Sequence, residues 1–150
     1  MQFRKVVFID EENTCLSPFA EGLFRKKAND AEVKLQISSR GTVVLFSEPV
    51  SQKVALIASD YGFSLDGYYA RALTPADYEN DTLLLALDNA SRKRAFAIQS
   101  SVANVFTLKE YVGENGDIRL PVGEPAEKYE ATCKVLDRLL TLLLEKISQG

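Results

Sequence analysis

Strand-like runs alternate with helical patterns along this chain, and that alternation constrains the fold more than any other feature. Residues 3–9 and 82–87 are short apolar runs typical of buried strands, and residues 104–107 form a third. Residues 33–38 alternate apolar and polar side chains, as a strand does, and run into a predicted turn at residues 39–42. The sequence therefore predicts four strands spread along the chain.

Helical patterns separate these runs. The first helix is predicted to have Ser17 as its N-cap and Pro18 at its first helical position. Residues 51–61 predict a second helix, which ends at Gly62. A polar, basic helix is predicted from residue 89 to about residue 96.

The clearest helical pattern lies near the C-terminus, where apolar side chains recur at steps of four and three. Cys133 lies within this stripe, so we interpret it as a small core residue. Strands that alternate with helices predict an α/β fold, with a parallel sheet between two layers of helices and one domain over residues 1–150. The stripe consists of Tyr129, Cys133, Leu136, Leu140, Leu143 and Ile147.

The composition excludes several kinds of chemistry. The 150 residues include no histidine, so the chain lacks an imidazole base, a Ser-His-Asp triad and a histidine-rich zinc site. Two cysteines are too few for a disulfide framework or an all-cysteine metal site. With 18 basic and 21 acidic residues the net charge is −3, which argues against a broad nucleic-acid-binding surface.

The hydropathy pattern also argues against a membrane protein. The apolar stretch at the N-terminus is too short for a signal peptide, and the leucine-rich run at residues 139–144 is much shorter than a membrane span. We therefore expect a cytoplasmic protein, a monomer or weak homodimer, that binds neither nucleic acid nor membranes.

The segment after the first strand is the first candidate site, because ligands of doubly wound α/β folds bind beyond the carboxyl ends of the strands. We call this segment loop 10–17. Its first three residues are acidic, and it leads directly into the predicted first helix. It reads Asp10, Glu11, Glu12, Asn13, Thr14, Cys15, Leu16 and Ser17.

The residues around this loop follow a family pattern. Val6-Val7-Phe8-Ile9 precede it, Asn13, Cys15, Ser17 and Pro18 stand within or beside it, and Ala20-Glu21 follow. At this spacing they resemble the strand V-x-F-V, the phosphate loop C-x-x-N-x-C-R-S-P and the A-E of the low-molecular-weight protein tyrosine phosphatases. Further stretches resemble the Gram-positive branch of that family, which includes protein-arginine phosphatases. The resemblance implies a three-layer α/β/α fold whose central layer is a mostly parallel four-stranded sheet. The stretches that resemble this branch are Phe106-Thr107-Leu108-Lys109-Glu110-Tyr111 and Gly116-Asp117-Ile118, while Ser39-Arg40-Gly41-Thr42 and Ala70-Arg71-Ala72-Leu73-Thr74 resemble segments of the family as a whole.

Four departures from the pattern affect the chemistry that the resemblance implies. Asp10 stands where the family has its cysteine nucleophile, and Leu16 stands where it has the arginine that clamps the phosphate. Leu120 stands in place of the aspartate that acts as general acid, and a loop glycine is Glu12. General acid catalysis alone contributes roughly 10²–10⁴-fold, and a leucine cannot supply it. The expected catalytic set is therefore degenerate.

The charges in loop 10–17 indicate what replaces a phosphate ion. Backbone N–H groups at a helix N-terminus attract an anion, but the three carboxylates of this loop repel phosphate. If Asp10 points inward, its own carboxylate occupies the anion site, and we hypothesise that the loop is plugged in this way. Arg40, where the family usually has alanine, is a possible pocket partner that pairs with Asp10.

A metal site and a cysteine nucleophile are two alternatives to this hypothesis for loop 10–17. Asp10, Glu11 and Glu12 together are a conceivable metal site, but adjacent carboxylates on a turn more often face solvent, so we expect neither metal nor cofactor. Cys15 is a conceivable shifted nucleophile, but Glu21 stands where an arginine is needed six residues later, which favours a partly buried thiol. Asn13 and Ser17 match family positions that brace the loop.

Two functions follow from these observations. The preferred interpretation is a catalytically inactive phosphatase-like protein that binds a protein partner or acts as a regulatory module. The alternative is a phosphohydrolase with altered chemistry, either a residual phosphotyrosine or phosphoarginine phosphatase or a metal-assisted enzyme that uses Asp10.

Overall fold

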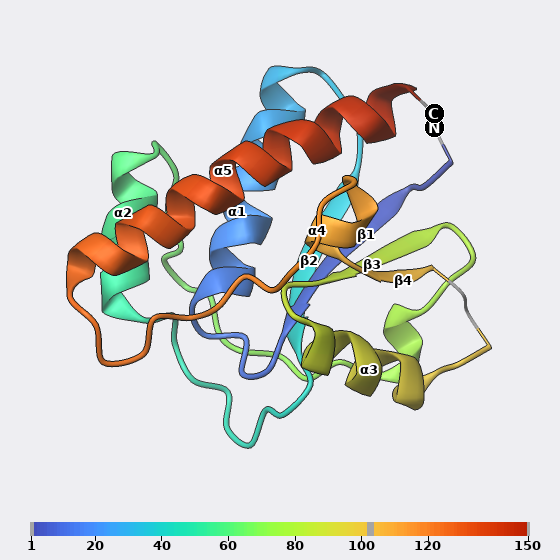
Figure 1. Ribbon diagram of the computed structural model, residues 1–150, viewed down its shortest axis with the longest axis horizontal. Helices are drawn as coiled ribbons and strands as arrows, with labels where there is room; N and C mark the ends of the chain where they lie inside the picture. The colour runs from blue at the N-terminus through green and yellow to red at the C-terminus, as the bar shows by residue number, and fades with distance from the viewer. Residues whose placement is uncertain (1, 102–103, 150) are drawn as a thin grey trace.

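The computed structural model describes residues 2–101 and 104–149. Its centre is one sheet with the strand order β2-β1-β3-β4, in which all three neighbouring pairs run parallel (Figure 1). The predicted parallel four-stranded sheet is confirmed. The strands are β1 (Lys5–Asp10), β2 (Gln36–Gly41), β3 (Thr82–Ala86) and β4 (Val105–Thr107).

Helices cover both faces of this sheet, as predicted. α5 lies across α1 on one face, with α2 beside them, and α3 packs on the opposite face (Figure 1). Within the described residues, none of the helices combines the length and apolar character needed to cross a bilayer. The helices are α1 (Leu16–Asp30), α2 (Gln52–Asp60), α3 (Asn89–Ile98), α4 (Leu108–Tyr111) and α5 (Ala126–Gln149), with a short 3₁₀ helix η1 (Pro75–Asp77).

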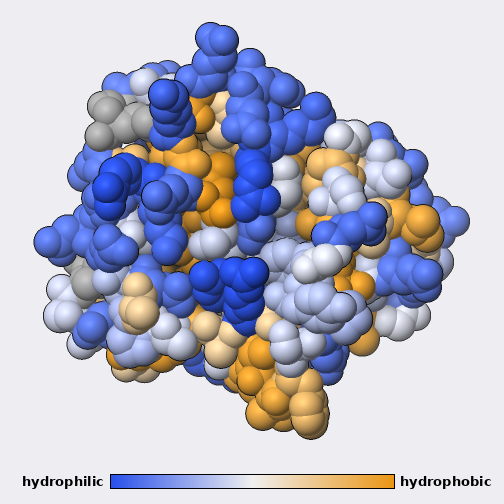
Figure 2. Space-filling model, turned by 180° about the vertical axis from the view of Figure 1, so that it is seen from behind, coloured by the Kyte–Doolittle hydropathy of each residue, from blue (hydrophilic) through white to orange (hydrophobic). Residues whose placement is uncertain are grey.

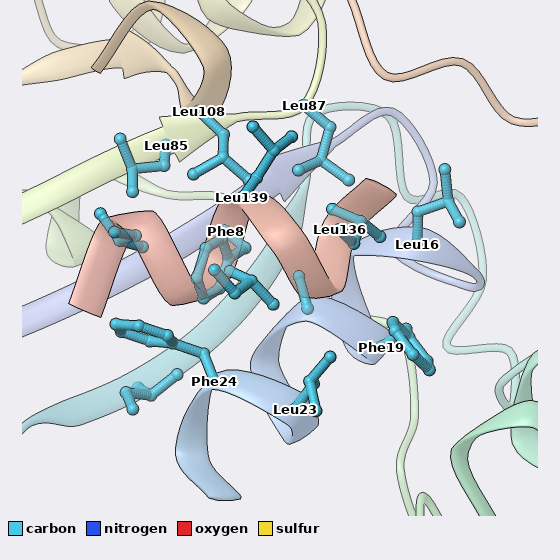
Figure 3. Packing of buried hydrophobic residues seen from close by; sticks show 14 of the residues in the cluster. Phe8, Leu16, Phe19, Leu23, Phe24, Leu85, Leu87, Leu108, Leu136 and Leu139 are labelled. Carbon is cyan, nitrogen blue, oxygen red and sulfur yellow. The ribbon is translucent and has the colours of Figure 1, made fainter. Parts of the chain in front are cut away.

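The main core fills the space between the sheet and the layer of α1, α2 and α5. Alternate residues of the strands point into it, because successive side chains of a strand face opposite sides. The predicted stripe of α5 is buried along its whole length, which includes the thiol of Cys133. Figure 3 shows side chains of the sheet, α1 and α5 converging, including Phe8, Leu85, Phe19, Leu23, Phe24, Leu136 and Leu139.

Two predicted boundaries near loop 10–17 are wrong. The turn predicted at residues 39–42 is largely strand, because Ser39, Arg40 and Gly41 pair with the last three residues of β1. Helix α1 begins at Leu16, one residue before the predicted cap, and the Ser17 side chain bonds outside the helix. The first difference arises from pairing with a distant strand, which local sequence patterns do not report.

We expect the substitution Phe24→Ala to destabilise the fold strongly. The Phe24 side chain is fully buried and makes an edge-to-face contact with Phe8, with ring centroids 5.6 Å apart. Removing a buried phenyl ring and leaving a cavity costs about 3–5 kcal/mol of unfolding free energy. Urea denaturation monitored by circular dichroism measures this loss. The control is Leu56→Ala on α2, where the side chain is 67% exposed, and we expect a change within about 0.5 kcal/mol.

Candidate functional site

Loop 10–17 connects the carboxyl end of β1 to the first turn of α1, and it forms one wall of a cavity of about 330 Å³. The loops after β3 and α4 form the other walls. The structure therefore brings together Asp10, Leu16 and Leu120, three of the positions at which the sequence was expected to depart from the phosphatase pattern. The cavity is lined by residues 10–16 and by Leu87, Asp88, Ile118, Leu120 and Val122.

The Asp10 carboxylate points into the loop, as predicted. Its Oδ1 accepts hydrogen bonds from the backbone N–H of Asn13 at 2.8 Å and from the Ser17 hydroxyl at 2.8 Å. Its Oδ2 accepts the backbone N–H of Ser17 at 3.0 Å. Because Ser17 lies in the first turn of α1, this carboxylate satisfies an N–H group that has no partner within the helix.

Burial raises the pKa of Asp10 to about 6, above the ordinary value for an aspartate. The hydrogen bonds from Ser17 and Asn13 act in the opposite direction, because they stabilise the ionised form. The nearby carboxylate of Asp88 adds to the rise. At neutral pH the carboxyl is therefore still mostly ionised, and it presents a negative charge to the donors of the loop.

Asn13 is the residue that fixes the shape of the loop. It is fully buried and has a φ of 60°, in the left-handed region that asparagine tolerates better than most residues. Its amide nitrogen donates to the hydroxyls of Ser17 at 2.8 Å and Ser39 at 3.0 Å. Its amide oxygen accepts the Tyr68 hydroxyl at 2.8 Å and the Arg71 backbone N–H at 2.9 Å. The predicted bracing roles of Asn13 and Ser17 agree with these contacts.

A buried polar group continues this network beneath the loop, and the sequence analysis missed it. The Ser39 hydroxyl donates to Glu21 Oε1 at 2.9 Å and lies within hydrogen-bond distance of the Tyr68 hydroxyl. The Arg25 guanidinium donates to Glu21 Oε2 at 2.9 Å, so the buried glutamate is paired with a cation. The available signal was an acidic residue, Glu21, within an otherwise apolar stretch of the first helix.

The predicted pairing of Arg40 with Asp10 is wrong. Arg40 Nε lies 3.3 Å from Asp77 Oδ1, and its Nη1 donates to the Ser39 carbonyl oxygen at 2.7 Å. The physical reason is the alternation of β2. Ser39 faces the loop and α1, so the next residue faces the opposite side of the sheet, toward η1.

The remaining ionisable groups of loop 10–17 differ in their surroundings. Glu11 and Glu12 are exposed, and Glu11 Oε1 lies 3.7 Å from Arg94 Nη1 on α3. Among residues 2–101 and 104–149, no three carboxylate or thiol groups converge as a metal ion requires. Burial raises the pKa of the Cys15 thiol, which disfavours the thiolate that a nucleophile needs.

The sequence as a whole matches one family model. Residues 5–150 match the model described as low molecular weight phosphotyrosine protein phosphatase. The chain belongs to this family. Among its relatives, the low-molecular-weight protein-tyrosine-phosphatase PtpB of Staphylococcus epidermidis is 30% identical over 128 residues, which cover 85% of this chain and 88% of the relative. The protein-arginine-phosphatase of Bacillus subtilis is 29% identical over 147 residues, 96% of this chain and 97% of the relative.

Solved structures of phosphatases in this family share the fold. A mutant of the YwlE arginine phosphatase with a phosphorylated active-site serine has a TM-score of 0.92 and 26% identity, covering 97% of each chain. The low-molecular-weight protein tyrosine phosphatase of T. tengcongensis has a TM-score of 0.87 and 31% identity, covering 95% of this chain and 98% of that one. The predicted three-layer architecture is confirmed.

We expect the contribution of Asp10 to stability to fall as the pH rises. The folded protein binds the Asp10 proton more tightly than the unfolded chain does, so ionising this carboxyl costs folding free energy. Its contribution is fully present below the ordinary aspartate pKa of about 4 and is lost as the pH passes through about 6. The measurement is the difference in unfolding free energy between the wild type and Asp10→Asn across this range.

The wild type should therefore lose stability relative to Asp10→Asn as the pH rises. The matched control is Asp66→Asn, at an exposed position outside the cavity, for which the difference should stay constant. If the wild type kept the same stability relative to Asp10→Asn across this range, or gained stability relative to it as the pH rose, the result would contradict the burial of this charge.

Replacing Asn13 should destabilise the loop through lost hydrogen bonds. Both Asn13→Gly and Asn13→Ala leave buried donors and acceptors without partners, and we expect each to lower the unfolding free energy by roughly 2–4 kcal/mol. Alanine is strained at the positive φ, so it should cost about 1 kcal/mol more than glycine. Chemical denaturation of both variants measures the two effects separately. A loss below about 1 kcal/mol in both would show that these bonds do not hold the loop.

Proposed function

We propose that this member of the phosphatase family is catalytically inactive and acts as a binding or regulatory module. One observation carries the proposal: the Asp10 carboxylate accepts the N–H groups of Asn13 and Ser17. Backbone N–H groups at the start of a helix are the donors that a phosphate ion needs. A negative side chain that holds these donors competes directly with a bound phosphoryl group.

The residues around Asp10 support the same conclusion. Leu16 and Leu120 line the cavity at positions where, by the family resemblance, an arginine and a general acid are expected. Neither side chain can donate a hydrogen bond to a phosphoryl oxygen or a proton to a leaving group. Loss of one oxyanion contact alone costs about 10²–10³-fold in rate, and here several contributions are missing together.

The alternative function is phosphoryl hydrolysis with altered chemistry. Two observations favour keeping it as a candidate: Asp10 lines the cavity, and the relatives are named as phosphatases. An aspartate nucleophile would attack the phosphorus atom through one carboxylate oxygen as the bond from phosphorus to the substrate's leaving oxygen or nitrogen breaks and that atom takes a proton from water. Water would then cleave the resulting aspartyl-phosphate and release phosphate, and such chemistry uses Mg²⁺ to neutralise the phosphate charge. Both oxygens of Asp10 already accept hydrogen bonds from the loop, which opposes this role.

We expect the purified protein to release no phosphate above background from p-nitrophenyl phosphate or from a phosphoarginine peptide, with or without Mg²⁺. An ion that binds the folded state raises the melting temperature. Because we expect the loop to bind no phosphate, inorganic phosphate should leave the melting temperature of the protein unchanged. The measurements are a colorimetric phosphate-release assay and thermal denaturation at increasing phosphate concentration.

The variant Asp10→Ala distinguishes the two functions. If the protein is inactive, removing the carboxylate frees the loop donors, so phosphate should stabilise Asp10→Ala but not the wild type. If the protein is an enzyme that uses Asp10, turnover should be present in the wild type and lost in this variant, and that result would refute our proposal. Asp66→Ala, at an exposed position outside the cavity, is the control for both assays.

A further inference from the structure

A second, smaller cavity of about 180 Å³ adjoins the first one. The two cavities share Glu12 and Thr14, so the wall between them is part of loop 10–17. Its other residues come from the segment between β2 and α2. We call the two neighbouring cavities together the acidic groove. The second cavity is lined by Glu12, Thr14, Val43, Val44, Leu45, Phe46 and Glu48.

The rim of the acidic groove exposes large apolar side chains. Leu45 is 81% exposed and Phe46 is 73% exposed, and across the larger cavity Val122 is 76% exposed. Figure 1 shows the segment between β2 and α2 projecting from the body of the molecule at the bottom of the view, and Figure 2 shows apolar surface at the same lower edge from behind. Apolar side chains this exposed around a cavity are typical of a contact surface for another molecule.

The charges of the acidic groove all have one sign. Within the described part of the chain, its charged lining residues are acidic: Asp10, Glu11, Glu12, Glu48 and Asp88. A guanidinium already lies at its edge, since Arg94 approaches Glu11 to 3.7 Å. A concave surface lined by one sign of charge concentrates ligands of the opposite sign. The groove therefore selects a cation.

The arrangement of these carboxylates favours an organic cation over a metal ion. They are spread around two cavities, and among the described residues no three of them converge on one point. The larger cavity also has apolar walls from Leu87, Ile118 and Leu120. A long side chain with a methylene stem and a charged end fits both features, because the stem contacts apolar walls while the end pairs with carboxylates.

We infer that the acidic groove binds a basic and apolar segment of a partner protein, an inference that rests on the proposed binding function. An arginine side chain of the segment enters the larger cavity, where its planar guanidinium pairs with carboxylates at the mouth. Glu12, between the two cavities, is the principal partner, because the oxygens of Asp10 are held by the loop and Asp88 Oδ1 accepts the Ser91 backbone N–H at the start of α3. An apolar residue of the same segment lies against Leu45 and Phe46.

The test uses a fluorescein-labelled peptide that contains one phenylalanine and one arginine separated by a glycine, with anisotropy as the readout. The wild-type protein should bind this peptide and should bind the citrulline version at least tenfold more weakly, because citrulline keeps the shape and lacks the charge. Replacement of the phenylalanine by serine should also weaken binding. A lysine version should bind with intermediate affinity.

Variants of the protein locate the site. Glu12→Gln and Phe46→Ser should each weaken arginine-peptide binding by about fivefold to tenfold, and Glu130→Gln, at an exposed position on α5, should leave it unchanged. Circular dichroism of each variant checks that the fold is retained. Equal binding of the arginine and citrulline peptides, no binding of either, or unchanged binding by Glu12→Gln would overturn the inference.

A phosphoarginine version of the peptide separates this inference from the proposed function. It should bind more weakly than the arginine peptide, because its phosphate meets the carboxylates, and tighter binding would count against a cation site. Phosphate release measured in the same samples reports on catalysis independently. Release together with weak arginine binding refutes both proposals, whereas no release with no arginine binding refutes the groove alone.

Discussion

The hydrogen bonds from loop 10–17 to the Asp10 carboxylate are the interactions on which the rest of the site depends. The first turn of a helix leaves several backbone N–H groups without partners in the helix. These groups need hydrogen-bond acceptors, and their partial positive charge favours an anion. In this chain the anion is covalently part of the strand that precedes the loop. The hydrogen bonds from Asn13 and Ser17 therefore hold the loop around a carboxylate of its own chain.

Buried hydrogen bonds beneath loop 10–17 hold it in this conformation. Asn13 links the loop to Ser39 of β2 and to the backbone at Arg71, so three segments distant in sequence share one buried side chain. Glu21 and Tyr68 extend this support into α1 and toward the far side of the loop. The shape of the loop thus depends on contacts from the whole strand–helix layer and not on the loop residues alone.

The sequence predicted the architecture well because periodicity and burial determine it locally. The parallel strands, the helices of both layers and the buried stripe of α5 all follow from patterns within ten to twenty residues. The contacts that depend on pairing between distant residues could not be predicted from the sequence. β2 extends through Arg40 because β1 lies beside it, and the direction of the Arg40 side chain follows from that register alone. The inward position of Asp10 was predictable because the charge of a helix start demands it, whereas the roles of Glu21 and Tyr68 required the three-dimensional arrangement.

The alternation of β2 has a consequence for how changes in this chain would be tolerated. Ser39 and Arg40 are neighbours in sequence but face opposite sides of the sheet. A slip of the β1–β2 ladder by one residue would place a guanidinium beneath the loop and move the hydroxyl away. The alignment of β1 and β2 determines the charge of the surface beneath loop 10–17 as well as its shape. An insertion or deletion upstream in β2 would therefore place a positively charged side chain beneath the loop, opposite the Asp10 carboxylate.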